Sequence, residues 1–114
     1  MQVQYLEIVS NDVEAVCAGY AAAHGVEFSA PDDMLGGART CTLADGGMVG
    51  VRAPMREDEA PVVRPYWLVD DIDKAVAAVA AAGAEIAMPP MEMPGRGKFA
   101  IYLLGSNDHG FWQL

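Results

Sequence analysis

The sequence predicts an α+β fold in which two βαβββ units form curved mixed sheets around a central cavity. Three observations support this prediction: the order of strand-like and helix-like segments repeats, helix-capping residues recur, and turn residues return at a spacing of about 60 residues. A single unit would leave one face of its small sheet without cover. Two units that share a cavity are therefore the economical arrangement of residues 1–114.

The first unit spans residues 1–53. Its strand-like composition, its Ala-rich segment and its turn residues predict a strand, a helix and three further strands, at residues 2–9, 10–25, 26–30, 38–44 and 48–53. Asn11 or Asp12 can accept the first free backbone N–H groups of the Ala-rich helix. Gly25 supplies the left-handed residue that commonly ends a helix.

The same order returns in a second unit, residues 63–114, after a polar linker at residues 54–62. The expected strand, helix and three strands lie at residues 63–69, 70–83, 84–89, 98–104 and 111–114. Asp71 and Gly83 match the positions of Asp12 and Gly25 in the first unit. An internal duplication explains these correspondences.

Composition excludes several classes of partner. The formal net charge of -9, with no cluster of basic residues, would repel a phosphate backbone and argues against nucleic acid. No apolar run approaches the ~18 residues of a membrane-spanning helix, and no signal-peptide pattern opens the chain. We therefore expect a cytoplasmic protein without a membrane partner, in which Cys17 and Cys41 are reduced thiols.

The motifs GGMVGVRAP, PYWLVDDIDKAV, PGRGKFAIYLL and GFWQL resemble the vicinal oxygen chelate superfamily. That superfamily includes glyoxalase I, the bleomycin-resistance proteins, fosfomycin-resistance enzymes and extradiol dioxygenases. The resemblance covers essentially the whole chain, and the sequence is similar to two-unit bacterial proteins described as glyoxalase-like. It implies the two-unit fold and a homodimer.

Metal-dependent members of this superfamily take their ligands from the first and last strand of each unit. The matching positions in the first strands hold Tyr5 and Arg64, and neither is a customary ligand. In the last strands they hold Gly50, or its neighbours Val51 and Arg52, and Gln113. Because an arginine also places a permanent positive charge where a cation would sit, we expect no metal and no other cofactor.

Strand alternation predicts which side chains share the cavity face. The expected lining residues are Tyr5, Glu7, Arg64, Tyr66, Phe111 and Gln113, with Arg52 beside them. Glu7 is either a ligand anchor or general base, or a partner in an internal salt bridge to Arg64 or Arg52. Arg64 either clamps an anion or lies in solvent at the strand mouth.

The predicted function is metal-independent binding of a small organic molecule, anionic or aromatic, as bleomycin-resistance proteins sequester drugs. Tyr5, Tyr66 and Phe111 would stack on the ligand, while polar side chains orient it. The first alternative is a superfamily enzyme, a lyase, isomerase or dioxygenase, with atypical metal ligands or with Glu7 as a metal-free base. The second is a non-catalytic protein whose pocket has collapsed and which acts through subunit contacts.

Overall fold

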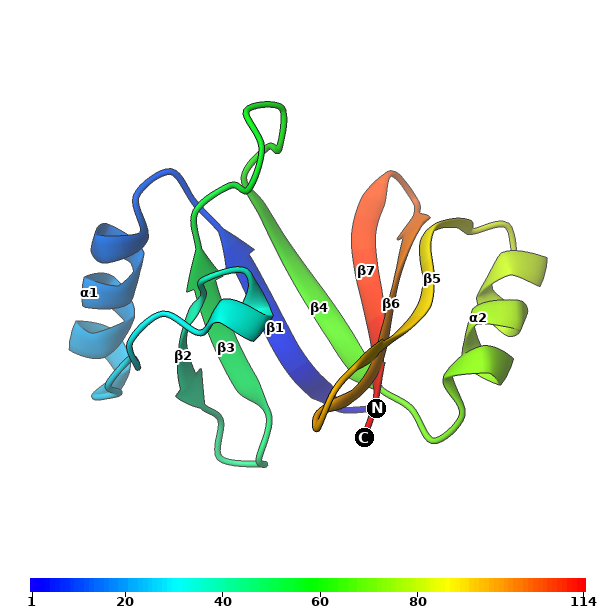
Figure 1. The fold of residues 1–114 in the computed structure, drawn as a ribbon, viewed down its shortest axis with the longest axis horizontal. Helices are drawn as coiled ribbons and strands as arrows, with labels where there is room; N and C mark the ends of the chain where they lie inside the picture. Colours follow the sequence, from blue (N-terminus) through cyan, green and yellow to red (C-terminus); the bar gives the residue numbers. More distant parts are fainter. The chain divides into compact units, whose positions relative to one another are not determined.

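The computed structural model describes residues 1–114 and contains seven β-strands, two α-helices and one short 3-10 helix (Figure 1). The chain forms two compact units. The N-terminal unit comprises Leu6–Val63, and the C-terminal unit comprises Met1–Tyr5 together with Arg64–Leu114. The linker therefore belongs to the N-terminal unit, while the first five residues belong to the C-terminal one.

The N-terminal unit contains five elements: β1 (Val3–Val9), α1 (Val13–His24), the 3-10 helix η1 (Asp33–Leu35), β2 (Arg39–Thr42) and β3 (Met48–Arg52). Its strands pair in the order β2-β3-β1, and β1 also enters the C-terminal unit. Asp12 caps α1 by accepting a hydrogen bond from the Ala15 N–H at 3.1 Å, and Gly25 ends it with φ 66°. The predicted capping residues are confirmed.

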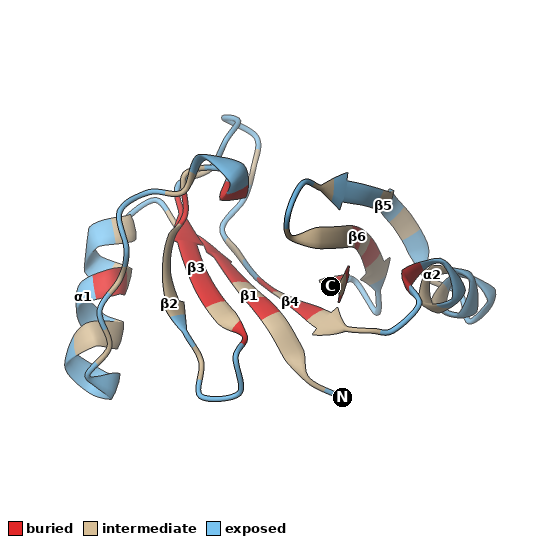
Figure 2. Ribbon diagram, turned by 60° about the horizontal axis from the view of Figure 1, so that its bottom comes forward, coloured by how far each residue is buried: buried red, intermediate tan, exposed pale blue.

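Helix α1 packs against β3 and covers the core of the N-terminal unit. The buried residues of that core are Ile8, Cys17, Val49 and Val51. Figure 2 shows α1 exposed along most of its outer surface, whereas β3 is buried along most of its length. This contrast is typical of a helix that protects one face of a sheet.

The strand predicted at residues 26–30 does not form. Ser29 lies beside Thr40 of β2, and its backbone N–H donates to the Thr40 carbonyl at 2.8 Å. The Thr40 N–H, however, donates to the Ser29 hydroxyl at 3.0 Å rather than to a backbone carbonyl. A serine hydroxyl that competes for ladder hydrogen bonds in this way, followed by Pro31, explains why a regular strand is absent.

The C-terminal unit contains β4 (Val62–Leu68), α2 (Ile72–Ala81), β5 (Glu85–Met93), β6 (Gly97–Leu104) and β7 (Asn107–Gln113). Its strands pair in the order β1-β4-β7-β6-β5. Strands β4 and β7 run parallel, while β6 is antiparallel to both of its neighbours. Helix α2 packs against β5, β6 and β7, so one face of this sheet is covered by a helix.

Two strands of the C-terminal unit are longer than predicted. β5 continues through Pro89 and Pro90, which an edge strand tolerates because a proline there removes no ladder bond. β7 begins at Asn107 because the tight turn falls on Gly105 and Ser106, with φ 60° and 64°. Such a pair of positive φ angles is typical of a type I′ hairpin turn.

The predicted α+β class with a mixed sheet is confirmed by this order of elements. Neither helix is both long enough and apolar enough to span a bilayer.

Candidate functional site

The register of β4 against β7 decides which predicted site residues share a face. Tyr66 pairs with Gly110, and Trp67 pairs with Phe111. Paired residues point to the same side of a sheet, and neighbours along a strand point to opposite sides. Tyr66 therefore lies on one face, while Phe111 and, two residues on, Gln113 lie on the other. The prediction that all three line one face is wrong, because the sequence does not specify the register between strands.

Phe111 and Gln113 lie on the face that α2 covers. The Gln113 Oε1 accepts a hydrogen bond from the Ile72 N–H at 2.8 Å, and so satisfies a free donor at the start of α2. Phe111 stacks on Tyr102, with ring centroids 4.7 Å apart. Gln113 thus joins the sheet to α2, and Phe111 packs against a neighbouring strand, so both side chains have structural roles.

Four aromatic side chains gather on the opposite, helix-free face of the C-terminal sheet. We call this group, Tyr5, Tyr66, Phe99 and Trp112, the aromatic face. The Tyr5 ring lies 5.7 Å from both Tyr66 and Trp112, and Trp112 stacks on Phe99 at 6.0 Å. Tyr5, Tyr66 and Trp112 are each no more than 4% exposed. Tyr5 and Tyr66 are therefore brought together as predicted.

Gly110 makes room for this arrangement. A Cβ atom at Gly110 would lie 2.3 Å from a ring carbon of Tyr66, so only glycine allows the ring to lie flat over β7. The sequence did not indicate Phe99 and Trp112, because the cavity face of β7 was assigned from Gln113, the position that matches a superfamily ligand. The glycine was the available signal, since a strand glycine often marks close approach of another group.

The β5–β6 hairpin closes one end of the aromatic face. Trp112 donates its indole N–H to the Arg96 carbonyl at 2.9 Å. Beside the hairpin lies a hollow of about 530 Å³, lined by Glu92, Met93, Gly95, Arg96, Gly97, Lys98, Gln113 and Leu114. A hollow of this size is within the range of small-molecule sites.

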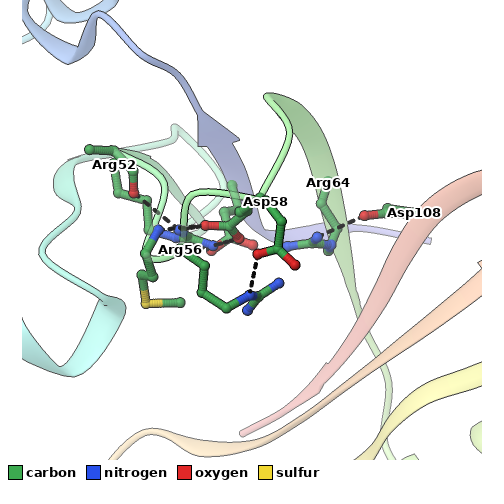
Figure 3. Close-up of polar contacts among 9 residues, drawn as sticks. Arg52, Arg56, Asp58, Arg64 and Asp108 are labelled. Carbon is green, nitrogen blue, oxygen red and sulfur yellow. Dashed lines mark hydrogen bonds and ion pairs between the residues drawn. The ribbon is translucent and has the colours of Figure 1, made fainter.

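Arg64 is buried rather than exposed at a strand mouth. Its Nη2 donates to the Asp108 Oδ2 at 2.7 Å, and its side chain is 10% exposed (Figure 3). Because Tyr66 pairs with Gly110, Arg64 and Asp108 share the helix-free face with the aromatic residues. The C-terminal unit therefore combines aromatic rings and a positive charge on one side of its sheet.

Glu7 and Arg52 come together in the N-terminal unit, with a third residue that the sequence did not indicate. The Arg52 Nε donates to the Glu7 Oε2 at 2.8 Å. Its two terminal nitrogens each donate to one oxygen of Glu59 at 2.8 Å, a bidentate pair. We call these three residues the Arg52 cluster (Figure 3 shows Arg52). No local pattern marks Glu59, which lies in a linker that reads as solvated.

The electrostatics of the Arg52 cluster follow from this geometry. The hydrogen bonds from Arg52 hold the pKa of Glu59 at about 2, against the opposing effect of burial. The carboxylates of Glu59 and Glu7 in turn raise the pKa of Arg52 above its ordinary value. The arginine side chain is only 3% exposed, so this is a buried and fully charged cluster. Of the two roles expected for Glu7, the geometry favours the internal salt bridge.

The residues at the superfamily's ligand positions do not fit a metal ion. Neither unit contains a group of three or more His, Cys, Asp or Glu side chains that could hold one. Arg64, at one of those positions, adds a positive charge that a cation would have to oppose. Burial raises the pKa values of Cys17 and Cys41, which disfavours the thiolate that metal binding requires.

Comparison with known proteins identifies the fold. No protein-family model and no curated protein sequence matches the chain. A hypothetical protein from Bacillus halodurans C-125 superposes with a TM-score of 0.74 at 10% identity, over 99% of this chain and 94% of that one. Methylmalonyl-CoA epimerase from Mycobacterium tuberculosis gives 0.69 at 11% identity, over 97% of this chain and 86% of that one.

A Streptomyces coelicolor methylmalonyl-CoA epimerase variant, in complex with 2-nitronate-propionyl-CoA, gives a TM-score of 0.63 at 16% identity, over 99% of this chain and 96% of that one. Identities this low establish the fold alone. The chain has the glyoxalase/bleomycin-resistance fold that these methylmalonyl-CoA epimerases share, which is the fold its sequence predicted.

Proposed function

We propose that this chain is a glyoxalase/bleomycin-resistance-like protein that binds a small organic molecule, without a metal ion, at the aromatic face of its C-terminal unit. One observation carries the proposal: the sheet face opposite α2 collects four rings and a buried arginine. Aromatic walls with a few polar anchors are typical of small-molecule sites.

The chemistry of the face favours an aromatic or planar apolar ligand that carries a carboxylate. Tyr66 and Trp112 pack edge to face against each other, so a ligand at this face would meet a rigid apolar wall of rings. Arg64 supplies a planar, permanently charged donor group suited to carboxylates. Asp108 orients that group through the 2.7 Å hydrogen bond to Nη2.

The ligands of the similar structures support the anionic character of this ligand class. One epimerase structure contains 2-nitronate-propionyl-CoA, and another contains methylmalonyl-CoA with an ammonium ion. Both are organic anions with a short acyl group. The same fold therefore accommodates organic anions in other proteins, which supports a small anion as the ligand here.

Calorimetric titration of the tag-free chain with benzoate, 2-naphthoate and methylmalonyl-CoA tests the proposal. We expect at least one to bind, and Arg64→Met to weaken that binding tenfold or more because the charged anchor is lost. Arg56→Met removes an arginine whose side chain is 66% exposed and serves as the matched control. Absence of binding by all three ligands, or equal binding by the Arg64 variant and wild type, would overturn the proposal.

Metal analysis of the same preparation tests the metal-free part. We expect no stoichiometric zinc, manganese, nickel or iron after purification without chelator, and no tight binding on titration. A tightly bound metal at one equivalent would contradict it, and would favour the metal-dependent enzyme alternative.

The metal-free enzyme alternative depends on Glu7 acting as a base. The Glu7 Oε2 accepts a hydrogen bond from Arg52 at 2.8 Å, which supports an anchoring role over proton abstraction. Exchange of the methylmalonyl-CoA α-proton in D₂O, monitored by NMR, distinguishes an anchoring Glu7 from a catalytic base. Exchange that is catalysed by the wild type and lost in Glu7→Gln would favour the enzyme.

A further inference from the structure

We propose that Arg52 forms a second, carboxylate-binding site, and that Glu59 of the linker occupies it as an internal ligand that a free carboxylate can displace. Displacement would release residues 54–61, which we call the linker loop. The inference concerns the N-terminal unit and does not depend on ligand binding at the aromatic face.

Arg52 is held ready for a carboxylate. Its Nη1 and Nη2 each donate to one Glu59 oxygen at 2.8 Å, which is the fork geometry by which arginine binds free carboxylates. Glu7 fixes the orientation of the guanidinium by accepting a hydrogen bond from its Nε, the nitrogen that Glu59 does not use. A Cβ atom at Gly36 would lie only 3.1 Å from the Arg52 Cδ, so the glycine leaves just enough room for the arginine side chain. The site therefore exists on the sheet independently of the linker loop.

The linker loop, by contrast, has few other contacts; one is made by Met55, whose Sδ would lie 3.0 Å from a Cβ atom at Gly36. Its other hydrogen bonds within the N-terminal unit join loop residues to one another: the Met55 N–H donates to the Glu59 Oε1 at 2.7 Å, and the Glu59 N–H to the Arg56 carbonyl at 3.2 Å. Most of its residues are exposed, and a hollow of about 660 Å³ lies against it. In Figure 1 the loop projects beyond the end of β3. Segments with such sparse contacts open at low free-energy cost.

Exchange of one carboxylate for another preserves the charge of the cluster. Glu7 and Glu59 place two negative charges around the single positive charge of Arg52. A ligand carboxylate that replaces Glu59 restores the same two bonds, so the buried arginine never loses its partner. Glu59 competes with a free carboxylate for Arg52 only because the chain holds it nearby. For a short flexible segment, this covalent link corresponds to an effective concentration of about millimolar order. The fitting ligand is a small monocarboxylate or dicarboxylate that binds Arg52 more tightly than this.

Titration of the full chain with malonate and acetate, neither of which carries an aromatic ring, tests the proposal. Glu59→Gln removes the competing charge while it preserves side-chain size, and we expect it to bind one of these probes at least tenfold more tightly than wild type. Glu57→Gln changes an exposed glutamate of the same loop and should leave the affinity unchanged. Arg39→Met removes an arginine that pairs with the exposed Glu14 and should also leave malonate binding unchanged. The dependence on Glu59 distinguishes failure here from failure at the aromatic face.

The Met55 amide provides an independent readout in the unmodified protein. Because it donates to Glu59, its hydrogen exchange should accelerate at least fivefold when malonate saturates the wild-type chain. Exchange of the Ala15 amide, which donates to the Asp12 cap of α1, should not change. The proposal is overturned if neither probe binds Glu59→Gln, if that variant and wild type have equal affinity, or if bound malonate leaves Met55 exchange unaltered.

Discussion

The two units use corresponding strand ends in different ways. β3 of the N-terminal unit ends at Arg52, which lies buried between two carboxylates. β7 of the C-terminal unit ends at Gln113, a neutral side chain that satisfies the first free N–H of α2. The same order of elements thus carries a charged cluster in one unit and a helix cap in the other.

The first strands differ in the same sense. Glu7 of β1 belongs to the charged cluster, whereas Tyr66, at the corresponding place in β4, belongs to the aromatic face. A buried charge must remain paired, since removal of one partner leaves the other charge uncompensated in a medium of low dielectric, which lowers stability. An aromatic group loses only contact area and edge interactions. A substitution in the Arg52 cluster should therefore lower the free energy of unfolding more than one of similar size in the aromatic face.

The largest effect is expected for Arg52→Met. This change leaves two buried carboxylates without their cation, and we expect the free energy of unfolding to fall by about 3–5 kcal/mol. Urea unfolding measures it. The matched change Arg56→Met, at an arginine that is 66% exposed, should cost less than about 0.5 kcal/mol. An equally small loss of unfolding free energy for both variants would contradict the prediction that the buried cluster contributes more than an exposed arginine.

The second largest effect is expected from acid, which should remove the contribution of the Arg52–Glu59 pair to stability. Arg52 lowers the pKa of Glu59 from 4.5 to about 2, so its contribution is complete above the unfolded pKa and is lost as the pH falls from 4.5 towards 2. The loss should reach up to about 3 kcal/mol, because each pKa unit corresponds to about 1.4 kcal/mol. Urea unfolding at pH 6, 4 and 2.5 should show this decline, and Glu59→Gln should lack it. Parallel pH profiles for both proteins would contradict the prediction.

Two glycine substitutions contrast the aromatic face with the outer surface of α1. Gly110→Ala drives a methyl group into the Tyr66 ring and should destabilise the chain by about 1–3 kcal/mol. Gly19→Ala, in α1 with no atom within 4 Å of the added Cβ, should stabilise it by about 0.5–1 kcal/mol. Thermal unfolding followed by circular dichroism should give shifts of opposite sign. Equal shifts would mean that the Tyr66 ring can move away at little cost.

The smallest effect is expected at Gln113. Replacement by alanine removes the acceptor for the Ile72 N–H and should cost about 1 kcal/mol. Gln113→Glu preserves an oxygen acceptor near the positive end of the helix, so its cost should stay within about 0.5 kcal/mol of zero. Chemical denaturation of both variants makes the comparison, and an equal loss for alanine and glutamate would argue against the capping role.

Local sequence signals predicted much of the fold. The caps at Asp12 and Asp71 and the left-handed residue Gly25 place the helices where they occur. The repeat of these signals predicted the order of elements in both units, apart from the missing strand at residues 26–30. That strand was lost to a side-chain hydrogen bond of Ser29, which acts on a neighbour eleven residues away.

The candidate site was less predictable. Strand parity placed Tyr5 and Tyr66 on one face, because side chains alternate along a strand. Arg52 was one of the two arginines expected as a partner for Glu7. Phe111 and Gln113 were assigned to the wrong face, since the parity of β7 depends on its pairing with β4.

The sequence by itself therefore determined the helices, most of the strands and the residue types available to each unit, because capping, turn chemistry and hydrophobic alternation act within a few residues. Only the tertiary structure decided the register of β7, the face that carries Trp112, and the pairing of Arg52 with Glu59. Register and buried ion pairs join segments far apart in the chain. Their energies depend on burial and geometry that no local pattern encodes.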